Sequence, residues 1–367
     1  AVDGQGFFAD TSSGGFTMNL PAGSAGSIVS VVDYTNTFQT GNLTVSPNGS
    51  QKIGGIASAF IANTEGQSLT WIYVDDTEGW KNIQDSTSNA TGNPFINASG
   101  GTETTCGNDK IHTFTGPGTF AVSKVADCAA NNVVSYLVVG GGGGGGIGDV
   151  SGGGGAGGYR ELKSPVTPYT ASPLDGYPNA PNRITVTATS FPIAVGGGGA
   201  AGATTPPGSN GTNGVNSTFS TITGAGGGGG SRGCASPPSS GSNGGSGGGA
   251  GYNNSTAGSG NTPPTTPSQG NNGGGNAGPS DAPAYGAGGG GGAGAVGGNG
   301  TPSNGGAGGN GVASSISGSS VTRSGGGGGA RNDSSAGGAG GSGGGGTGGG
   351  SGVAAGNGTD NTGGGGG

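Results

Sequence analysis

The residue types that most often carry catalysis are scarce in this chain. His112 is the single histidine, so the side chains cannot supply a Ser-His-Asp or Cys-His arrangement. It lies within a strand pattern, and we interpret it as an ordinary strand residue. Glycine blocks can cradle phosphate, but no Gly-Lys-Ser or Gly-Lys-Thr follows any block, which excludes a Walker A loop. We therefore expect no catalytic residues, no cofactor and no enzymatic activity.

Acidic residues are the next candidates for chemistry. Asp75, Asp76 and Glu78 form the densest acidic group and could hold Ca²⁺ through their oxygens. They also occupy a predicted turn, where aspartate favours contacts with its own backbone, so we expect a turn and no metal site. A glycan depolymerase would need paired carboxylates in a groove, yet the only acids after Gly196 are Asp281, Asp333 and Asp360.

Two cysteines lie symmetrically about a predicted hairpin. Strand-like segments flank Gly116-Pro117-Gly118, a three-residue connection. Pairing symmetric about Pro117 sets Cys106 opposite Cys128, and cross-strand neighbours have Cβ atoms about 4.5–5.5 Å apart. We expect a Cys106–Cys128 disulfide, which would indicate an extracellular or virion-surface location; the alternative is two unpaired thiols in loops. Cys234 is then free or paired between chains.

Composition limits the fold and the partners. Apolar residues make up 28% of the 367 residues and charged residues 7%, with 102 glycines and a net charge of −7. An ordinary domain is about 45–50% apolar and 25% charged, so one conventional core near the N-terminus is expected. The absence of a basic patch argues against nucleic acid as a partner. No apolar run approaches the roughly 20 residues of a membrane span, so no membrane insertion is expected.

The strand signals predict an all-β module over residues 1–85, because short β-forming segments alternate with turns and no helical period occurs. A linker rich in Ser, Thr, Asn and Gly is expected over 86–101. Over residues 102–230 we expect a β-strand and glycine-rich domain, because strand-like segments are repeatedly followed by glycine blocks. Its strands are expected within the hairpin about Pro117 and at 136–139, 183–187, 191–195 and, more weakly, 217–222.

Residues 231–367 alternate glycine runs with polar loops. Disorder is the ordinary interpretation of such a composition, and collagen is excluded because five-glycine blocks break the Gly-X-Y period. We favour a bundle of polyglycine-II helices, which are extended, with three residues per turn and a rise of about 3.1 Å. Without side chains, neighbouring helices can approach closely enough for backbone hydrogen bonds. The expected fold is thus an all-β module and a β-hairpin domain leading into this bundle, with essentially no α-helix.

Two parts of the chain resemble bacteriophage proteins. Residues 5–22, with Val32-Asp33-Tyr34, Asn42-Leu43-Thr44-Val45 and Trp71-Ile72-Tyr73-Val74-Asp75, resemble a module recurrent in tail fibres of marine tailed phages. Residues 111–120, 136–139 with the following glycines, and 157–161 resemble the glycine-rich domain of such fibres. The glycine field is similar to the polyglycine-sandwich tips of phage adhesins, whose distal loops touch bacterial receptors. A short apolar strand usually closes the fibre domain and none follows Gly363, so we expect truncation at the C-terminus.

The resemblance implies a structural and receptor-binding part of a phage tail fibre, extracellular on the virion. Expected partners are a bacterial outer-surface receptor, protein or glycan, and other tail-fibre or baseplate proteins. A homotrimer is expected, because fibres commonly trimerise and the small apolar content of the first module suggests that subunit contacts complete its core. Loop residues of types preferred at recognition surfaces are the receptor-binding candidates: Tyr252, Tyr285, Arg323 and Arg331. A secreted cell-surface filament or matrix protein is the alternative, while an ice-binding bundle would need a more regular Gly-x-x face.

Overall fold

The computed structural model describes residues 1–86, 95–126, 128–206, 208–233, 239–252, 255–278 and 285–367. The chain divides into two compact units, Ala1–Gly92 (unit 1) and Asn93–Gly367 (unit 2). Both are all-β, as expected. In the described ranges the only helical segments are short 3₁₀ turns, η1 (Ala129–Asn132) and η2 (Ala180–Asn182).

Unit 1 consists of two sheets. The first has the order β1-β3-β6-β7 and the second β2-β4-β5. Strand β3 pairs in parallel with β1, and β4 pairs in parallel with β2, while the other pairs are antiparallel. The strands are β1 (Gln5–Ala9), β2 (Phe16–Asn19), β3 (Ile28–Asp33), β4 (Leu43–Ser46), β5 (Phe60–Ala62), β6 (Ser68–Tyr73) and β7 (Trp80–Ser86).

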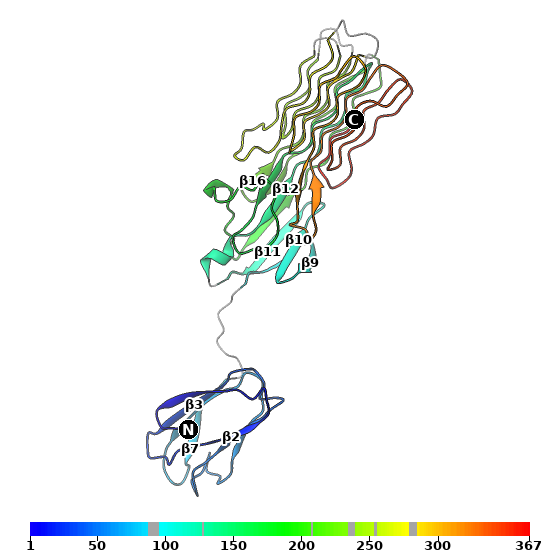
Figure 1. The fold of residues 1–367 in the computed structure, drawn as a ribbon. Helices are drawn as coiled ribbons and strands as arrows, with labels where there is room; N and C mark the ends of the chain where they lie inside the picture. Colours follow the sequence, from blue (N-terminus) through cyan, green and yellow to red (C-terminus); the bar gives the residue numbers. More distant parts are fainter. Residues whose placement is uncertain (87–94, 127, 207, 234–238, 253–254, 279–284) are drawn as a thin grey trace. The chain divides into compact units, whose positions relative to one another are not determined.

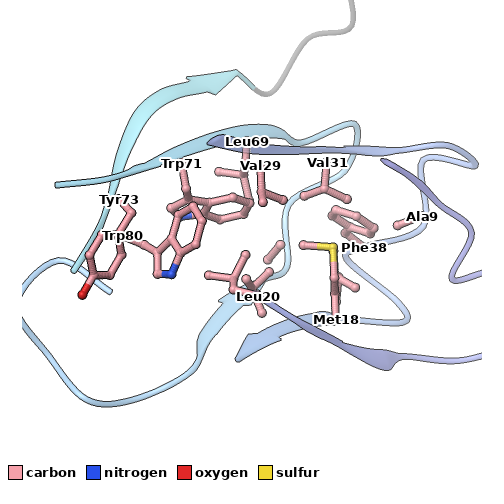
Figure 2. Packing of buried hydrophobic residues seen from close by; sticks show 13 residues of the cluster. Ala9, Met18, Leu20, Val29, Val31, Phe38, Leu69, Trp71, Tyr73 and Trp80 are labelled. Carbon is pink, nitrogen blue, oxygen red and sulfur yellow. The ribbon is translucent and has the colours of Figure 1, made fainter. Parts of the chain in front are cut away.

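The core of unit 1 lies between these sheets (Figure 2). Strand residues alternate between the two faces of a sheet, so Leu69 and Trp71 of β6 point inward from one sheet and Met18 of β2 from the other. Asp33 is fully buried, and its carboxylate accepts hydrogen bonds from the backbone N–H groups of Thr37, Phe38 and Gly66 at 3.0–3.1 Å. The conventional core expected near the N-terminus is thus present. The expectation of a single core is wrong, because buried apolar side chains of unit 2, including Tyr136, Leu162 and Phe219, form a second cluster.

Unit 2 begins with a region of small sheets. A five-stranded sheet has the order β16-β15-β14-β11-β8, and three two-stranded pairs are β9–β10, β12–β13 and β17–β18. The strands are β8 (Asn97–Ser99), β9 (Thr102–Cys106), β10 (Asp109–Thr113), β11 (Gly118–Lys124), β12 (Tyr136–Val139), β13 (Tyr159–Leu162), β14 (Ser190–Ala194), β15 (Ser217–Phe219), β16 (Ile222–Gly224), β17 (Val312–Ser314) and β18 (Val321–Arg323).

The expected hairpin about Pro117 is wrong. Strand β10 pairs with β9, whereas β11 pairs with β8 on one side and β14 on the other. Cys106 therefore lies opposite Asp109, and Cys106 and Cys128 are both free and exposed, without the expected disulfide. Strand β11 forms backbone hydrogen bonds with two strands, β8 and β14, whereas the expected hairpin would have given it one partner. The additional pairing outweighs the preference of Gly116-Pro117-Gly118 for a hairpin turn. Cys234 lies outside the described residues.

Other boundaries also differ from expectation. Segment 183–187 makes only an isolated bridge to Val133, and 217–222 is interrupted by a turn between β15 and β16. Strands β13 and β17–β18 were not expected. Residues 87–94 of the expected linker lie outside the described residues, and β8 already belongs to unit 2. Residue 230 is not a boundary, because Ser242 N–H donates to the carbonyl of Gly229 at 2.9 Å.

The glycine runs form extended passes, each crossing unit 2 between the strands and the far end (Figure 1). Within one pass, residues three positions apart form backbone hydrogen bonds with the same neighbouring pass. The N–H groups of Gly140, Gly143 and Gly146 donate to the carbonyls of 158, 155 and 152 at 2.8–3.0 Å. A three-residue repeat is the hydrogen-bond pattern of polyglycine-II helices. The runs therefore form the expected bundle.

The pass 151–158, here the central pass, bonds six neighbours. Its N–H groups from Gly152 to Gly158 donate to passes at 225–231, 288–291 and 363–366. Its carbonyls accept from passes at 140–146, 246–249 and 327–330. Donors and acceptors thus point in three directions each, and all of its residues are buried. The central pass is the axis of the bundle.

Bundle packing leaves no room for side chains at most interior positions. A Cβ built on Gly290 would lie far inside 3.0 Å of the carbonyl oxygen of Gly154, and one on Gly345 would overlap that of Gly326. On the outermost pass, by contrast, a Cβ on Gly197 would meet nothing within 4 Å. Most glycines inside the bundle are therefore required, although Ala156, Ala250 and Ala287 are also fully buried there, whereas Gly197 at the surface can be replaced.

Asparagine side chains extend the bonding at the edge of the bundle. The side-chain carbonyls of Asn210, Asn213 and Asn216 accept from the N–H groups of Arg232, Gly229 and Gly226 at 2.8–2.9 Å. The three asparagines are three residues apart, and so are the three N–H donors. Each asparagine side-chain amide therefore accepts the bond that a backbone carbonyl of a further pass would accept. This Asn-x-x-Asn-x-x-Asn ladder is visible in the sequence but was not recognised there.

Buried polar groups join the bundle to the strands. The Glu161 carboxylate, 2% exposed, accepts hydrogen bonds from the Tyr159 hydroxyl, the Ser172 N–H and the Ser314 hydroxyl at 2.6–3.0 Å. Tyr136 donates its hydroxyl to the carbonyl of Asn182 at 2.7 Å. Burial raises the pKa of Tyr136 to about 12 and also raises the pKa values of Tyr159 and Tyr169.

The bundle predicts different costs for inner and outer glycines. Gly290→Ala should destabilise unit 2 by more than about 1–3 kcal/mol, because backbone must shift to admit the methyl group, and Gly345→Val should do so more strongly. Gly197→Ala and a change at the exposed loop residue Ser303 should leave stability nearly unchanged. Urea unfolding measures the difference. Equal midpoints for Gly290→Ala and Gly197→Ala would contradict the bundle.

The buried tyrosine predicts alkaline destabilisation. Between pH 10 and 12 the folded chain keeps the Tyr136 proton that the unfolded chain has lost, so stability falls as pH rises through this range and is unaffected below it. Two pKa units correspond to about 2.7 kcal/mol. The urea midpoint of Tyr136→Phe, which cannot ionise there, should fall less steeply with pH than that of the wild type. Parallel slopes would refute the assignment to Tyr136.

Candidate functional site

The far end of the bundle, opposite the strands of unit 2, collects the loops that join successive passes. We call it the distal end. Tyr252 and Tyr285 both lie there: the first follows the pass 246–251, and the second precedes the pass 286–294. Their ring centroids are 4.7 Å apart with the planes at 49°, and both side chains are half-buried. The structure thus brings together two of the four candidate residues.

Arg331 lies at the same end. The preceding residue, Ala330, donates its N–H to the carbonyl of Ser151 and accepts from the N–H of Ala287, both at 2.9 Å. The Arg331 guanidinium forms an ion pair with Asp333 and donates to the side-chain carbonyl of Asn304 at 3.4 Å. The backbone N–H of Ser335 and this guanidinium lower the pKa of the Asp333 carboxyl.

Backbone contacts connect the tyrosine pair to the arginine. Tyr252 N–H donates to the carbonyl of Val150, the residue before Ser151, at 3.0 Å, and Gly286 N–H donates to the carbonyl of Thr301. Thr301 in turn bridges to Asn304, the partner of Arg331. The tyrosines, the 301–304 turn and Arg331 are therefore neighbours on one surface, which we call the distal rim.

Arg323 does not belong to the distal rim. It ends β18, pairs with Val312 of β17 and donates to the Ser317 hydroxyl at 3.4 Å. The β17–β18 hairpin lies at the strand end of unit 2 (Figure 1). Arg323 was expected in a loop between glycine runs, but it instead ends a strand of the β17–β18 hairpin.

Val150 is a distal-rim residue that sequence reasoning missed. Its φ of 58° lies in the left-handed region, which is strained for a β-branched side chain. Even so, the side chain is 4% exposed. Tyr285 also has a positive φ, of 39°. Backbone strain of this kind collects at functional sites. No sequence signal marks either position.

The remaining candidates for chemistry have structural roles. Asp75 accepts from the N–H groups of Thr77 and Glu78 at 2.9 and 2.8 Å, which is the expected turn. His112 lies in β10, and its Nδ1 is 2.8 Å from the carbonyl oxygen of Gly100. No group of three potential metal ligands occurs among the described residues. The described part of the chain also has no helix able to span a membrane.

Comparison with protein families identifies a glycine-rich domain. A model described as a glycine-rich domain matches residues 113–367, which include most of unit 2 and the whole distal rim. Comparison with curated proteins finds no match.

Proposed function

The chain belongs to the glycine-rich domain family, and from this premise we propose that it is a structural and receptor-binding part of a phage tail fibre. The distal rim carries the proposal. Tyr252, Tyr285 and Arg331 are of types that dominate binding energy at interfaces, and they gather at the end of a rigid bundle. The proposed partner is a bacterial outer-surface receptor, protein or glycan, and the proposed location is the virion surface. Other tail-fibre or baseplate proteins are the proposed structural partners.

The arrangement of the bundle and its loops supports the receptor-binding role. Described residues at the ends of passes, such as Tyr252 and Ala330, are held by backbone hydrogen bonds to neighbouring passes, so their side chains can vary without loss of the scaffold. A secreted cell-surface filament or matrix protein would use the same bonding, but it would not require an aromatic pair at one end. The distal rim therefore favours attachment over a purely structural role.

We also propose that unit 1 assembles the fibre as a homotrimer. Nine large apolar side chains of unit 1 are exposed, against five among the described residues of the much longer unit 2. We infer that neighbouring subunits cover part of this exposed apolar surface.

Attachment predicts a loss of binding when the tyrosine pair is truncated. Tyr252→Ala or Tyr285→Ala should weaken binding of the labelled protein to intact host cells by about tenfold or more, the effect of removing an interface hot spot. Tyr177→Ala is the matched control, since Tyr177 is 44% exposed and lies outside the distal rim. Host cells are identified by screening bacterial isolates for binding of the wild type. Equal binding by all four proteins would reject the distal rim as the receptor site.

Assembly predicts a sedimentation mass three times that of the chain. The mass should persist on dilution if subunit contacts complete the surface of unit 1. A folded species of single-chain mass at every concentration would reject the homotrimer.

A further inference from the structure

On the outer face of the β1-β3-β6-β7 sheet, the strands β1, β3 and β6 carry no charged side chain, and Lys81 of β7, opposite Ile72, borders this uncharged part. The inward side chains of these strands fill the core, and alternation leaves the others outside. The outer residues are Gly6 and Phe8 of β1, Ile28, Ser30 and Val32 of β3, and Ser68, Thr70 and Ile72 of β6. The Ser30 and Thr70 hydroxyls in the middle of this face form a hydrogen bond with each other at 3.0 Å, which lowers the cost of covering them.

Phe8 projects from this face. Its side chain is 79% exposed, the highest value among the large apolar residues of the described chain. The Tyr34 ring meets it edge to face, with centroids 6.0 Å apart and planes at 77°. This contact supports the ring from one side and leaves most of its surface in water. An exposed phenyl ring held in place by a neighbour is suited to insertion into a partner.

A shallow hollow lies beside the same ring. It is lined by Gly6, Phe7, Phe8, Ser30, Val31, Val32 and Ser68 and has a volume of about 260 Å³. The missing side chain of Gly6 creates the space between Phe8 and Ser30. Ligand pockets occupy roughly 300–1,000 Å³, so the hollow suits a single side chain better than a separate small molecule.

We propose that the Phe8 ring of one copy of this chain fills the hollow beside Gly6 of a second copy. A projection and a recess on the uncharged part of one face are self-complementary, which points to a second copy rather than to a charged or polar partner. In a closed ring each subunit gives one Phe8 and receives one. The inference deepens the proposed self-assembly by naming its surface, and it rests on that proposal but not on receptor binding.

Two substitutions test the contact from opposite sides. Phe8→Ser removes the projection, and Gly6→Val fills the recess. The second should fold, because a Cβ at Gly6 meets only the Ser30 Cβ at 3.9 Å, and Gly6 does not have a positive φ. Ile61→Ser, at a residue that is 53% exposed on β5 of the other sheet, is the control. Folding of unit 1 can be followed by tryptophan fluorescence, since both tryptophans of the chain, Trp71 and Trp80, lie in its core.

In sedimentation, the wild type and Ile61→Ser should have the mass of a trimer. Phe8→Ser and Gly6→Val should each have the mass of a monomer. An equal mixture of the last two should form heterodimers, because the Phe8 ring of one still fits the hollow of the other. A mixture that stays monomeric, or either variant alone remaining trimeric, would overturn the Phe8 contact and leave self-assembly standing. A monomeric wild type would overturn both.

Discussion

Backbone hydrogen bonding between neighbouring passes is the interaction on which unit 2 depends, and it requires interior positions that carry glycine or a side chain as small as that of Ala156. In the central pass each N–H from Gly152 to Gly158 donates to another pass. Because each bond is shared between a donor and an acceptor residue, the bundle has about one bond per residue, and its contribution of about 0.5–1.5 kcal/mol is comparable to the roughly 1–2 kcal/mol of backbone entropy lost per residue. The bundle is thus balanced closely, and a single misplaced methyl group matters.

Strands and polar side chains supply the remaining specificity. Strands β12 and β16 lead directly into passes, so their pairing sets the register in which the first glycines meet. Where a pass lacks a backbone partner, a side-chain amide replaces it, as Asn213 does for Gly229 and the buried Gln269 does for Ala225. The Glu161 carboxylate binds Ser314, 153 residues later. These contacts fix which of many similar glycine runs lie together, which glycine itself cannot specify.

The two units expose different chemistry. Unit 1 has a conventional core and exposes large apolar side chains, as a subunit contact would require. Unit 2 exposes few apolar groups among its described residues. Its strands enclose a second apolar cluster, whereas the interior of its bundle holds mostly glycine. Separation of this kind lets loop residues such as Tyr252 change without disturbing the passes, because the bundle is held by groups that every residue carries.

The sequence by itself determined the local character of each segment. Alternating apolar residues specified the strands of unit 1, and unbroken glycine specified polyglycine-II helices, since both follow from side-chain sterics over a few residues. Only the tertiary structure decided the partners. Strand β11 pairs with β8 and β14 and does not form the local hairpin with β10. Cys106 and Cys128 are therefore not cross-strand neighbours. The runs 286–298 and 337–350 each turn back and form two passes, as the bonds from Gly289 to Gly298 and from Gly348 to Gly338 require. The number of passes sets the end at which each loop emerges, so Tyr252 and Tyr285 meet while Arg323 lies at the opposite end. Glycine runs carry no side chain to mark where they turn, and the sequence therefore could not place the site.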